Sequence, residues 1–551
     1  MILSQMFLFI IFSLVSILSF SGLGQLINKN KSEDLLNNFF FGLIVVSFII
    51  TLIHFFYKIN LFVSAIIVIA GLLINLRHIF FSRTKINNNY LTYILIFIIL
   101  IPIYISQKYH EDFGYYHLPY IINVINEKII FGLANINRAF VHNSLWLNIM
   151  PVFYFKDNYN FVTLPTFLIY VIFIIFSINQ IINQHKQKMS SLFLIITIFY
   201  LILKFTRLSE FGNDIPSLIF SSLALYNFFR FLEEEDLDKK KDYFFRNFCF
   251  TSFAILIKFS AIPVILPTIY LFLKNHKILI HEIFKKNFIF IYFLSILFFI
   301  QQFIYTGCFI FPSNISCLNV SWFDQNFLDS KYKLELINKG YFATAKDTLS
   351  EQEYLSNYKW LSYWFERNLI GFSEHIGTMA IPIIIFLLFL KKEKNQNLIK
   401  HSKTGFFPFF IIIGFVFWLE FSPVYRFGII YFLSTIFLLS FLFYEKKIFS
   451  KRIFLSFITI FLIFNLTKNI DRLSNEKRIF IGIKKIQNFS MLNTLYDKNE
   501  IQIFQPDINS NAKKGNGWQG RLCWDIDFIC TKNKVIIEKK NSYLFVKRSD
   551  N

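Results

Sequence analysis

The chain has 551 residues, of which 55% are hydrophobic, and a formal net charge of +21 at pH 7. Its mean hydropathy of +0.49 excludes a water-soluble fold, and repeated apolar runs of about 17–25 residues are typical of polytopic helical membrane proteins. The positive charge does not indicate nucleic-acid binding, because Lys and Arg cluster in short loops between apolar segments, as the positive-inside rule describes.

The first apolar segment lacks a basic start and a clear cleavage site, so we interpret it as a membrane helix rather than a signal peptide. The pair 247–258 and 261–273 is short enough to be either one span or two. The apolar runs predict an all-α polytopic protein of about 13–14 membrane helices, at 4–27, 36–56, 60–76, 91–106, 161–183, 189–205, 215–232, 247–258, 261–273, 287–305, 374–390, 405–421, 428–444 and 453–468.

Loop charge predicts the orientation of these spans. The basic loops fall on one side only if 247–273 crosses twice, and we expect that side to be cytoplasmic. These loops are Asn28–Lys31, Arg77–Lys85, His185–Lys188, Lys239–Arg246, Lys274–Lys286, Lys391–Lys403 and Glu445–Arg452. The run from Glu233 to Asp242 is expected to be a solvated part of this side. The loops at the opposite ends of the spans are then expected to face outward. They are 107–160, 206–214, 306–373 and 422–427, together with the tail from about 470.

The chain is expected to divide into three parts: N-terminal helices at 1–90, a membrane core with its outer loops at 91–469, and a small extracytoplasmic domain at 470–551. In the last part, Lys534–Glu538 and Tyr543–Val546 alternate as strands do.

Four of the five cysteines form two local pairs, Cys308 with Cys317 and Cys523 with Cys530, in segments predicted to face outward. Disulfides persist in oxidising compartments, so both pairs are predicted to be bonded and to support the orientation. Free thiols are the alternative. Cys249 lies in an apolar segment and is predicted to be a small core residue. No spacing indicates a metal site.

The polar stretch that begins at His110 follows directly after an apolar segment, and ionisable groups at such a place favour a functional interpretation. If it continues as a helix, Asp112 and Tyr116 share a face, with His117 close by. A carboxylate there, Asp112 or its neighbour Glu111, can act as a general base on an acceptor hydroxyl. A solvated or capping acidic pair is the alternative, although Pro119 would kink the helix and so favours a shaped site.

Further along the same outer loop, Arg138 and His142 lie four residues apart and are expected to share a helical face that binds phosphate or sugar hydroxyls. An ordinary interfacial amphipathic helix is the alternative. Loop 206–214 adds Arg207, Glu210 and Asp214 as further candidates for the site. Asp214, two residues before Pro216, is equally a candidate helix N-cap.

Two later turns place cations on the predicted outer side. Lys258 lies between two apolar runs and suits a phosphate, with snorkelling to the interface as the alternative. Arg426, beside Tyr425 in an aromatic turn, can clamp phosphate through paired hydrogen bonds. A structural pair between Glu420 and Arg426 is the alternative.

The spacing Asp112-x3-Tyr116-His117-Leu118-Pro119 resembles the Asp-x3-Tyr-His-Leu-Pro signature of bacterial multi-spanning proteins related to the GT-C glycosyltransferases. The glycosyltransferase family 39 enzymes, which include the protein O-mannosyltransferases, and the aminoarabinose transferases of lipid A belong to the same broad fold class. Three further features are similar to that group: the Lys258-Phe259 turn, the Thr306-Gly307-Cys308 loop with its later Pro and Cys, and the Pro423-x-Tyr425-Arg426-Phe427-Gly428 turn. The resemblance covers about residues 90–470.

The resemblance implies a GT-C-like fold with a small outward α+β C-terminal domain, in the bacterial inner membrane. It implies sugar transfer on the outer face, from a polyprenyl-phosphate donor to a cell-envelope glycan, lipid or protein acceptor. Asp112 would be the base, with Glu111 its alternate, and Lys258 and Arg426 would hold the lipid-linked phosphate. No cofactor is predicted, and a divalent metal has no support in the sequence.

Three other functions remain open. A transporter or flippase for lipid-linked sugars would need polar residues at mid-membrane and broken helices in related halves. A glycan polymerase or ligase of another fold would place its catalytic residues in loop 306–373. A non-catalytic assembly protein would use 470–551 to bind a partner.

Overall fold

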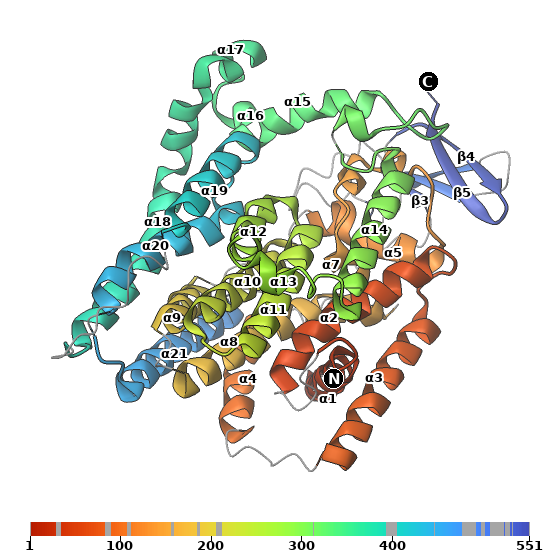
Figure 1. Cartoon of the computed structure of the whole chain (residues 1–551). Coiled ribbons are helices and arrows are strands. Elements are labelled where there is room, and N and C mark those ends of the chain that lie inside the picture. Colours follow the sequence, from red (N-terminus) through yellow and green to blue (C-terminus); the bar gives the residue numbers. More distant parts are fainter. Residues whose placement is uncertain are drawn as a thin grey trace.

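The computed structural model describes residues 2–28, 35–82, 90–106, 112–155, 159–184, 188–204, 212–311, 313–392, 405–445, 447–475, 492–496, 502–506, 523, 529–531 and 533–549. Among these, eight helices are long and apolar enough to cross a membrane: α1 (Ile2–Gly24), α2 (Leu35–His54), α3 (Leu61–Ser82), α8 (Leu164–Asn183), α10 (Asp214–Glu233), α14 (Lys286–Thr306), α18 (Trp360–Phe389) and α21 (Lys451–Asn475). Shorter apolar helices stand between them (Figure 1), namely α4 (Tyr90–Ile105), α9 (Lys188–Leu203), η5 (Phe259–Val264) with α12 (Ile265–Lys274), α19 (Phe407–Phe421) and α20 (Ile429–Tyr444). The predicted polytopic helical fold is confirmed.

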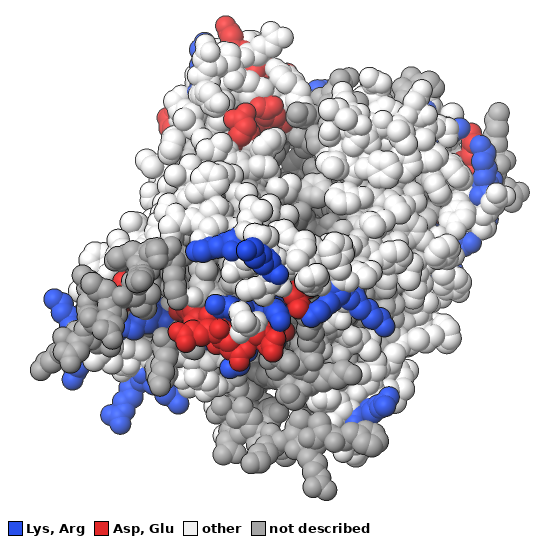
Figure 2. Space-filling view, viewed as in Figure 1, with Lys and Arg blue, Asp and Glu red and all other residues white. Residues whose placement is uncertain are grey.

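The outer surface of the helices is apolar where lipid would cover it. On α14, the exposed side chains Ile289, Phe293, Ile296 and Ile300 recur at helical spacing and keep between 37% and 54% of their surface. Figure 2 shows a broad uncharged area on the same face, above a band of Lys, Arg, Asp and Glu side chains. A continuous apolar patch of this kind suits hydrocarbon rather than water.

The segment 247–273 is divided by a turn, and it contains the end of one helix and the start of another. α11 (Leu237–Ile257) ends at Lys258, whose backbone is extended with φ −156° and ψ 122°. The chain then turns into η5 and α12, with Pro263 inside η5. Lys258 therefore lies at a turn between two helices, as predicted for a double crossing.

The run from Glu233 to Asp242 is exposed over 235–239, as expected of a solvated segment, but the loop is shorter than expected, because α11 already begins at Leu237. The reason is a cap: the Asp236 carboxylate accepts hydrogen bonds from the backbone N–H groups of Asp238 and Lys239. The polar residues after Asp236 therefore form the first turns of a helix whose later turns enter the bundle.

The predicted basic loops meet at one end of the bundle. The Lys188 ammonium, at the start of α9, donates to the Glu445 carbonyl beyond α20 at 2.8 Å. Lys447 donates to the carbonyl of Leu390, where α18 ends, at 3.0 Å. Loops far apart in sequence thus lie together, as one membrane face requires.

The first outer loop and the C-terminal tail meet at the opposite end. The described strands of the tail are β1 (Leu492–Tyr496), β2 (Gln502–Pro506), β3 (Ile529–Cys530), β4 (Val535–Lys540) and β5 (Tyr543–Arg548). They form the sheets β1-β2-β3 and β4-β5, so the strand expectation for the tail is confirmed. Phe131 donates to the Leu544 carbonyl at 2.9 Å and accepts from the Val546 N–H at 2.8 Å. Figure 1 shows this hairpin beside α5 (Leu118–Asn126) and α14.

Both predicted disulfides are present, joining Cys308 to Cys317 and Cys523 to Cys530. Cys249 is a buried free thiol, as predicted. Each bond closes a short loop at the end of the bundle that carries the β4-β5 hairpin. By its effect on loop-closure entropy, each bond stabilises the folded protein by about 2–3 kcal/mol.

A buried ion pair also fastens the tail to loop 306–373, and it gives a first prediction. The Arg548 Nε lies 3.0 Å from the Asp324 carboxylate, and their side chains are 10% and 2% exposed. Asp324→Ala leaves a guanidinium buried without this partner, so we expect a loss of about 3 kcal/mol in the free energy of unfolding. Thermal unfolding in detergent and proteolysis of the β4-β5 hairpin measure it.

Glu538→Gln is the matched control, since it removes the more exposed pairs with Lys540 and Lys547 on the same hairpin and should cost under about 1 kcal/mol. The double variant Asp324→Leu with Arg548→Met should restore most of the loss, because an apolar pair carries no unpaired charge. Equal stability of Asp324→Ala and wild type would show that the pair does not hold the tail.

Candidate functional site

The Asp112–Pro119 motif forms a distorted helical turn. Residues Phe113–His117 make a π-helical turn, η1, which leads into α5. Pro119 has no N–H to donate to the Tyr115 carbonyl, and the Asn137 side-chain amide donates to that carbonyl instead, at 2.9 Å. Pro119 was predicted to kink the helix, and the structure shows a widened π-helical turn just before it. Such turns are common at functional sites.

Asp112 and Tyr116 lie on the side of this turn that faces the later cations. Both side chains are half-buried. Burial raises the pKa of Tyr116 above its usual range, the carboxylates of Asp112 and Asp214 raise it further, and the Arg426 guanidinium lowers it. Tyr116 therefore lies within electrostatic reach of Asp112, Asp214 and Arg426. His117 is buried and packs edge-on against the Tyr116 ring, with centroids 4.1 Å apart.

Arg138 and His142 do not share a helical face. The segment Arg138–Val141 is a 3-10 helix, η2, capped by the Asn137 side chain. With about three residues per turn, a spacing of four places the two side chains on different sides. Arg138 is exposed, and its charge opposes the rise in the pKa of Tyr115 that burial causes. His142 instead lies near Lys258.

His142 is fixed beside the Lys258 turn by its neighbour. The Ser144 hydroxyl donates to the Ile257 carbonyl at 2.8 Å, one residue before Lys258. The His142 ring is open to solvent on one side, but dense protein around it and the Lys258 ammonium lower its pKa to about 4. The imidazole is therefore neutral at pH 7 and can accept or donate a hydrogen bond.

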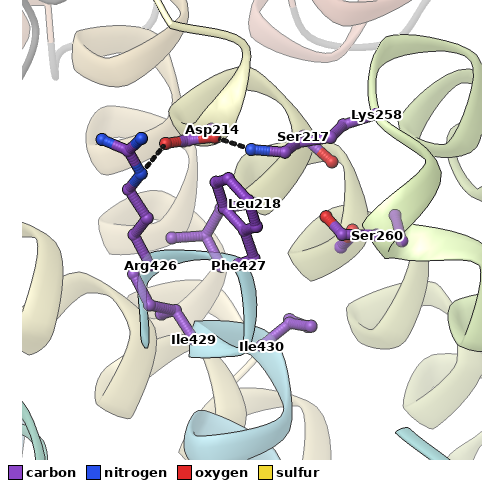
Figure 3. A pocket seen from close by; sticks show the side chains of 11 residues that line it. Asp214, Ser217, Leu218, Lys258, Ser260, Arg426, Phe427, Ile429 and Ile430 are labelled. Carbon is purple, nitrogen blue, oxygen red and sulfur yellow. Dashed lines mark hydrogen bonds and ion pairs between the residues drawn. The ribbon is translucent and has the colours of Figure 1, made fainter. Parts of the chain in front are cut away.

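An ion cluster of Asp214, Lys258 and Arg426 lies at the centre of the site (Figure 3). One carboxylate oxygen of Asp214 pairs with the Lys258 ammonium, and the other lies 3.2 Å from Arg426 Nε. The three side chains keep 24%, 21% and 29% of their surface, so solvent reaches each of them. Three turns that are far apart in sequence supply these three charges.

Asp214 is not the N-cap of α10, since that position belongs to Asn213. Asp214 is the first residue of the helix, where a carboxylate is favoured by the N–H groups of the first turn. Its side chain instead points between the two cations, which the capping alternative did not foresee.

Arg426 is held in place by two tryptophans. The Trp418 indole donates to the Val424 carbonyl at 2.8 Å, and the Trp364 indole donates to the Pro423 carbonyl at 2.6 Å. These bonds fix the start of the short helix η9 (Tyr425–Phe427) and so aim Arg426 at Asp214.

The alternative partner for Arg426 is wrong. Glu420, proposed as the structural partner of Arg426, has an exposed side chain on α19, and the carboxylate that pairs with Arg426 is Asp214. Tyr425 points away from the cluster, and its ring packs on His375 with centroids 4.5 Å apart.

A small pocket opens beside the cluster. Asp214, Ser217 and Ser221 line it from one face of α10, at helical spacing, and Ser260 lines it from η5. The Phe427 ring forms its floor under the Lys258 ammonium, which lies 3.1 Å from the ring centroid. The three serines were not predicted from the sequence. The helical spacing of Ser217 and Ser221 after Asp214 could have indicated two of them.

The pocket is lined by charges of both signs. Within the cluster two cations face one carboxylate, and the Asp112 carboxylate also acts on Lys258 from outside the cluster. Burial lowers the pKa of Lys258 to about 8 although the Asp214 carboxylate opposes this, and Arg426 lowers it further. A bound phosphate would relieve the repulsion between Lys258 and Arg426.

Three of the candidates, Glu111, Arg207 and Glu210, lie outside the described residues. Within the described part of the chain, no three His, Cys, Asp or Glu side chains group closely enough to hold a metal ion.

Comparison with known proteins assigns the chain to a family. No curated protein sequence matches the chain. Among solved structures it is similar to the arabinosyltransferase EmbB from Mycobacterium smegmatis, with 9% identity and a TM-score of 0.32, over 69% of this chain and 33% of that one. The chain thus spans about a third of the length of EmbB, and a likeness of this degree carries no argument about function. One family pattern matches residues 1–433, a range that includes Asp112, Asp214, Lys258 and Arg426. The chain belongs to the family described as "Domain of unknown function (DUF8201)".

Proposed function

We propose that this protein is a GT-C-like membrane glycosyltransferase that moves a sugar from a polyprenyl-phosphate donor to an acceptor of the cell envelope. The observation that carries the proposal is the Asp214–Lys258–Arg426 cluster beside Asp112 and Tyr116. A general base and a cationic pocket for a leaving phosphate are the two parts that such a transfer requires.

Asp112 is proposed as the base that accepts the proton of the attacking hydroxyl. Asp214 is less suited, because a carboxylate held between two cations is a weak base. Lys258 and Arg426 would stabilise the charge that develops on the lipid phosphate as the bond to the sugar breaks. Asp214 is then a positioning residue that keeps the two cations together.

The remaining candidates fit the acceptor side. His142 is neutral and Arg138 is exposed, so both can bind hydroxyl or phosphate groups of an incoming chain. Tyr116 lies within electrostatic reach of both the base and Arg426, and its ring and hydroxyl are proposed to contact the sugar.

One buried polar network lies near the reaction end of the bundle, as expected for an enzyme. Thr51 of α2 and Gln301 of α14 belong to one hydrogen-bond network through Asn148. Both lie in the last two turns of their helices, at the end that carries the Asp214 cluster, whereas a transporter binds its substrate near the midplane.

The test is a deletion of the gene in its own host, followed by mass spectrometry of surface glycans and lipid-linked sugars. We expect one envelope sugar to disappear and its lipid-phosphate donor to accumulate, and the gene restored from a plasmid to reverse both changes. A deletion strain with an unchanged donor pool and unchanged glycans would refute the proposal. A lipid-linked sugar trapped on the cytoplasmic face would favour the flippase.

A further inference from the structure

A second group of charged residues lies at the same end of the bundle as the Asp214 cluster but is separate from it. Lys204 follows α9, Glu374 belongs to α18, and Lys468 and Arg472 belong to α21. The Lys204 ammonium pairs with the Glu374 carboxylate, and the Lys204 side chain is only 11% exposed. We call Lys204, Lys468 and Arg472, with Glu374, the α21 cluster.

The helices that carry the α21 cluster are fastened to one another near it. The Asn465 amide of α21 donates to the Ile202 carbonyl of α9 at 2.6 Å, which brings Lys468 to the level of Lys204. Lys468 lies within electrostatic reach of Lys204, Arg472 and Glu374. Figure 1 shows α9, α18 and α21 together on the same side of the bundle.

Arg472 is turned toward the same place by a second contact. Its guanidinium donates to the Asn469 side chain at 3.4 Å, and that side chain also accepts from the Ser106 hydroxyl at the end of α4 at 2.9 Å. Lys468 and Arg472 are one helical turn apart, so they share a face of α21.

The depth of the α21 cluster matches the level of lipid headgroups. Lys204, Glu374 and Lys468 each lie 15–17 residues from the helix end at the basic-loop side, which is about 23–26 Å along a helix axis. A hydrocarbon core is about 30 Å thick, so the three groups stand near its far boundary.

Snorkelling explains a lone lysine at such a depth but not this group. Lys468 does extend along the lipid-facing Phe464, with its ammonium 5.8 Å from the ring centroid. Lys204 instead is largely buried and paired with Glu374, and the α21 cluster holds three cations and one carboxylate. The positive-inside bias also disfavours Lys and Arg at the end opposite the basic loops.

The α21 cluster adjoins the Asp214 cluster through η9. The Tyr200 hydroxyl lies 3.0 Å from His375 Nδ1, and the His375 ring packs on Tyr425. Arg426, the next residue, pairs with Asp214. One short helix therefore has the α21 cluster on one side and the proposed reaction site on the other.

We propose that Lys204, Lys468 and Arg472 form a second cationic site that binds the phosphate group of a membrane lipid at the headgroup level. The lipid approaches from the bilayer past the exposed Phe464 and Ile463 of α21. That the lipid is the sugar donor on its way to the Asp214 cluster rests on the proposed function. The binding of a lipid phosphate does not, and it is tested without any transfer reaction.

The test is equilibrium binding of a radiolabelled polyprenyl phosphate to the full-length protein in an uncharged detergent. We expect the double variant Lys468→Gln with Arg472→Gln to bind at least tenfold more weakly than wild type. Lys451→Gln with Arg452→Gln, at the other end of the same helix, should bind as wild type does. The charge-conserving pair Lys468→Arg with Arg472→Lys should also retain binding, which separates lost charge from misfolding.

Three outcomes would overturn the inference. The first is equal binding by wild type and the Lys468→Gln, Arg472→Gln variant. The second is loss of all binding in Lys258→Gln with Arg426→Gln while the α21 variant binds normally, which would assign the lipid phosphate to the Asp214 cluster alone. The third is full competition by inorganic phosphate, which would make this a site for free phosphate. Weak binding of the uncharged polyprenol, with no competition by inorganic phosphate, supports a lipid phosphate.

Discussion

Replacing Asp112 by Asn is expected to reduce the rate of sugar transfer by at least about 100-fold, since positioned general bases contribute about 10²–10⁴-fold. The side chain keeps its size and its place in the turn before η1, so the fold should survive. The amide has no negative charge and cannot take the proton from an acceptor hydroxyl. Membranes of the deletion strain supply the accumulated donor, and loss of that donor after addition of purified protein gives the rate.

Glu420→Gln is the matched control for Asp112→Asn. It removes a carboxylate from α19, one residue before the end of the helix that leads to η9, but from an exposed position. Its rate should stay near that of wild type. If Asp112→Asn transfers sugar as fast as Glu420→Gln, the base is another group, and Glu111 becomes the next candidate.

The helices were predictable because their signal is strong and local. Long apolar runs have few other folds available in a membrane, and basic loops mark one face. The start of α11 was not foreseen, because its first turns are polar and are stabilised by the Asp236 cap rather than by apolar periodicity. The same holds for η2, where the Asn137 cap makes a 3-10 turn and separates Arg138 from His142.

In the candidate site, the individual residues could be predicted from the sequence, but the contacts between them could not. Asp112, Lys258 and Arg426 each stand out in the sequence as charges next to apolar runs. What joins them is tertiary: Asp214 reaches both cations only because α10, the Lys258 turn and η9 meet at one end of the bundle. No spacing in the chain encodes that meeting, so the sequence supported both a cap for Asp214 and a Glu420 partner for Arg426.

The α21 cluster was missed for a related reason. Lys204 stands one residue beyond the end of α9, and Lys468 and Arg472 lie in the last turns of α21, where flanking cations are commonplace. Their significance comes from the Asn465–Ile202 hydrogen bond, which brings two such helix ends together.

The second large effect concerns pH. The Lys258 pKa of about 8 means that the free protein loses this charge as the pH rises through 8. In the proposed function the charged form binds phosphate, so kcat/KM should reach its full value well below pH 8 with respect to this group. It should fall about tenfold for each further pH unit, because kcat/KM reports the free enzyme. At pH 8 kcat/KM should be about half of its low-pH value, and at pH 10 it should be about 100-fold below that low-pH value.

Lys258→Arg tests this assignment, since a guanidinium stays protonated throughout this range. The variant should show little fall in kcat/KM up to about pH 10, whatever its absolute rate, because the group that loses its proton has been removed. In the wild type, kcat should begin to fall at a higher pH than kcat/KM, since a bound phosphate stabilises the ammonium and raises the Lys258 pKa. Lys447→Arg, at the basic-loop end, should keep the wild-type profile. An alkaline fall that persists unchanged in Lys258→Arg would assign it to another group and remove Lys258 from the phosphate site.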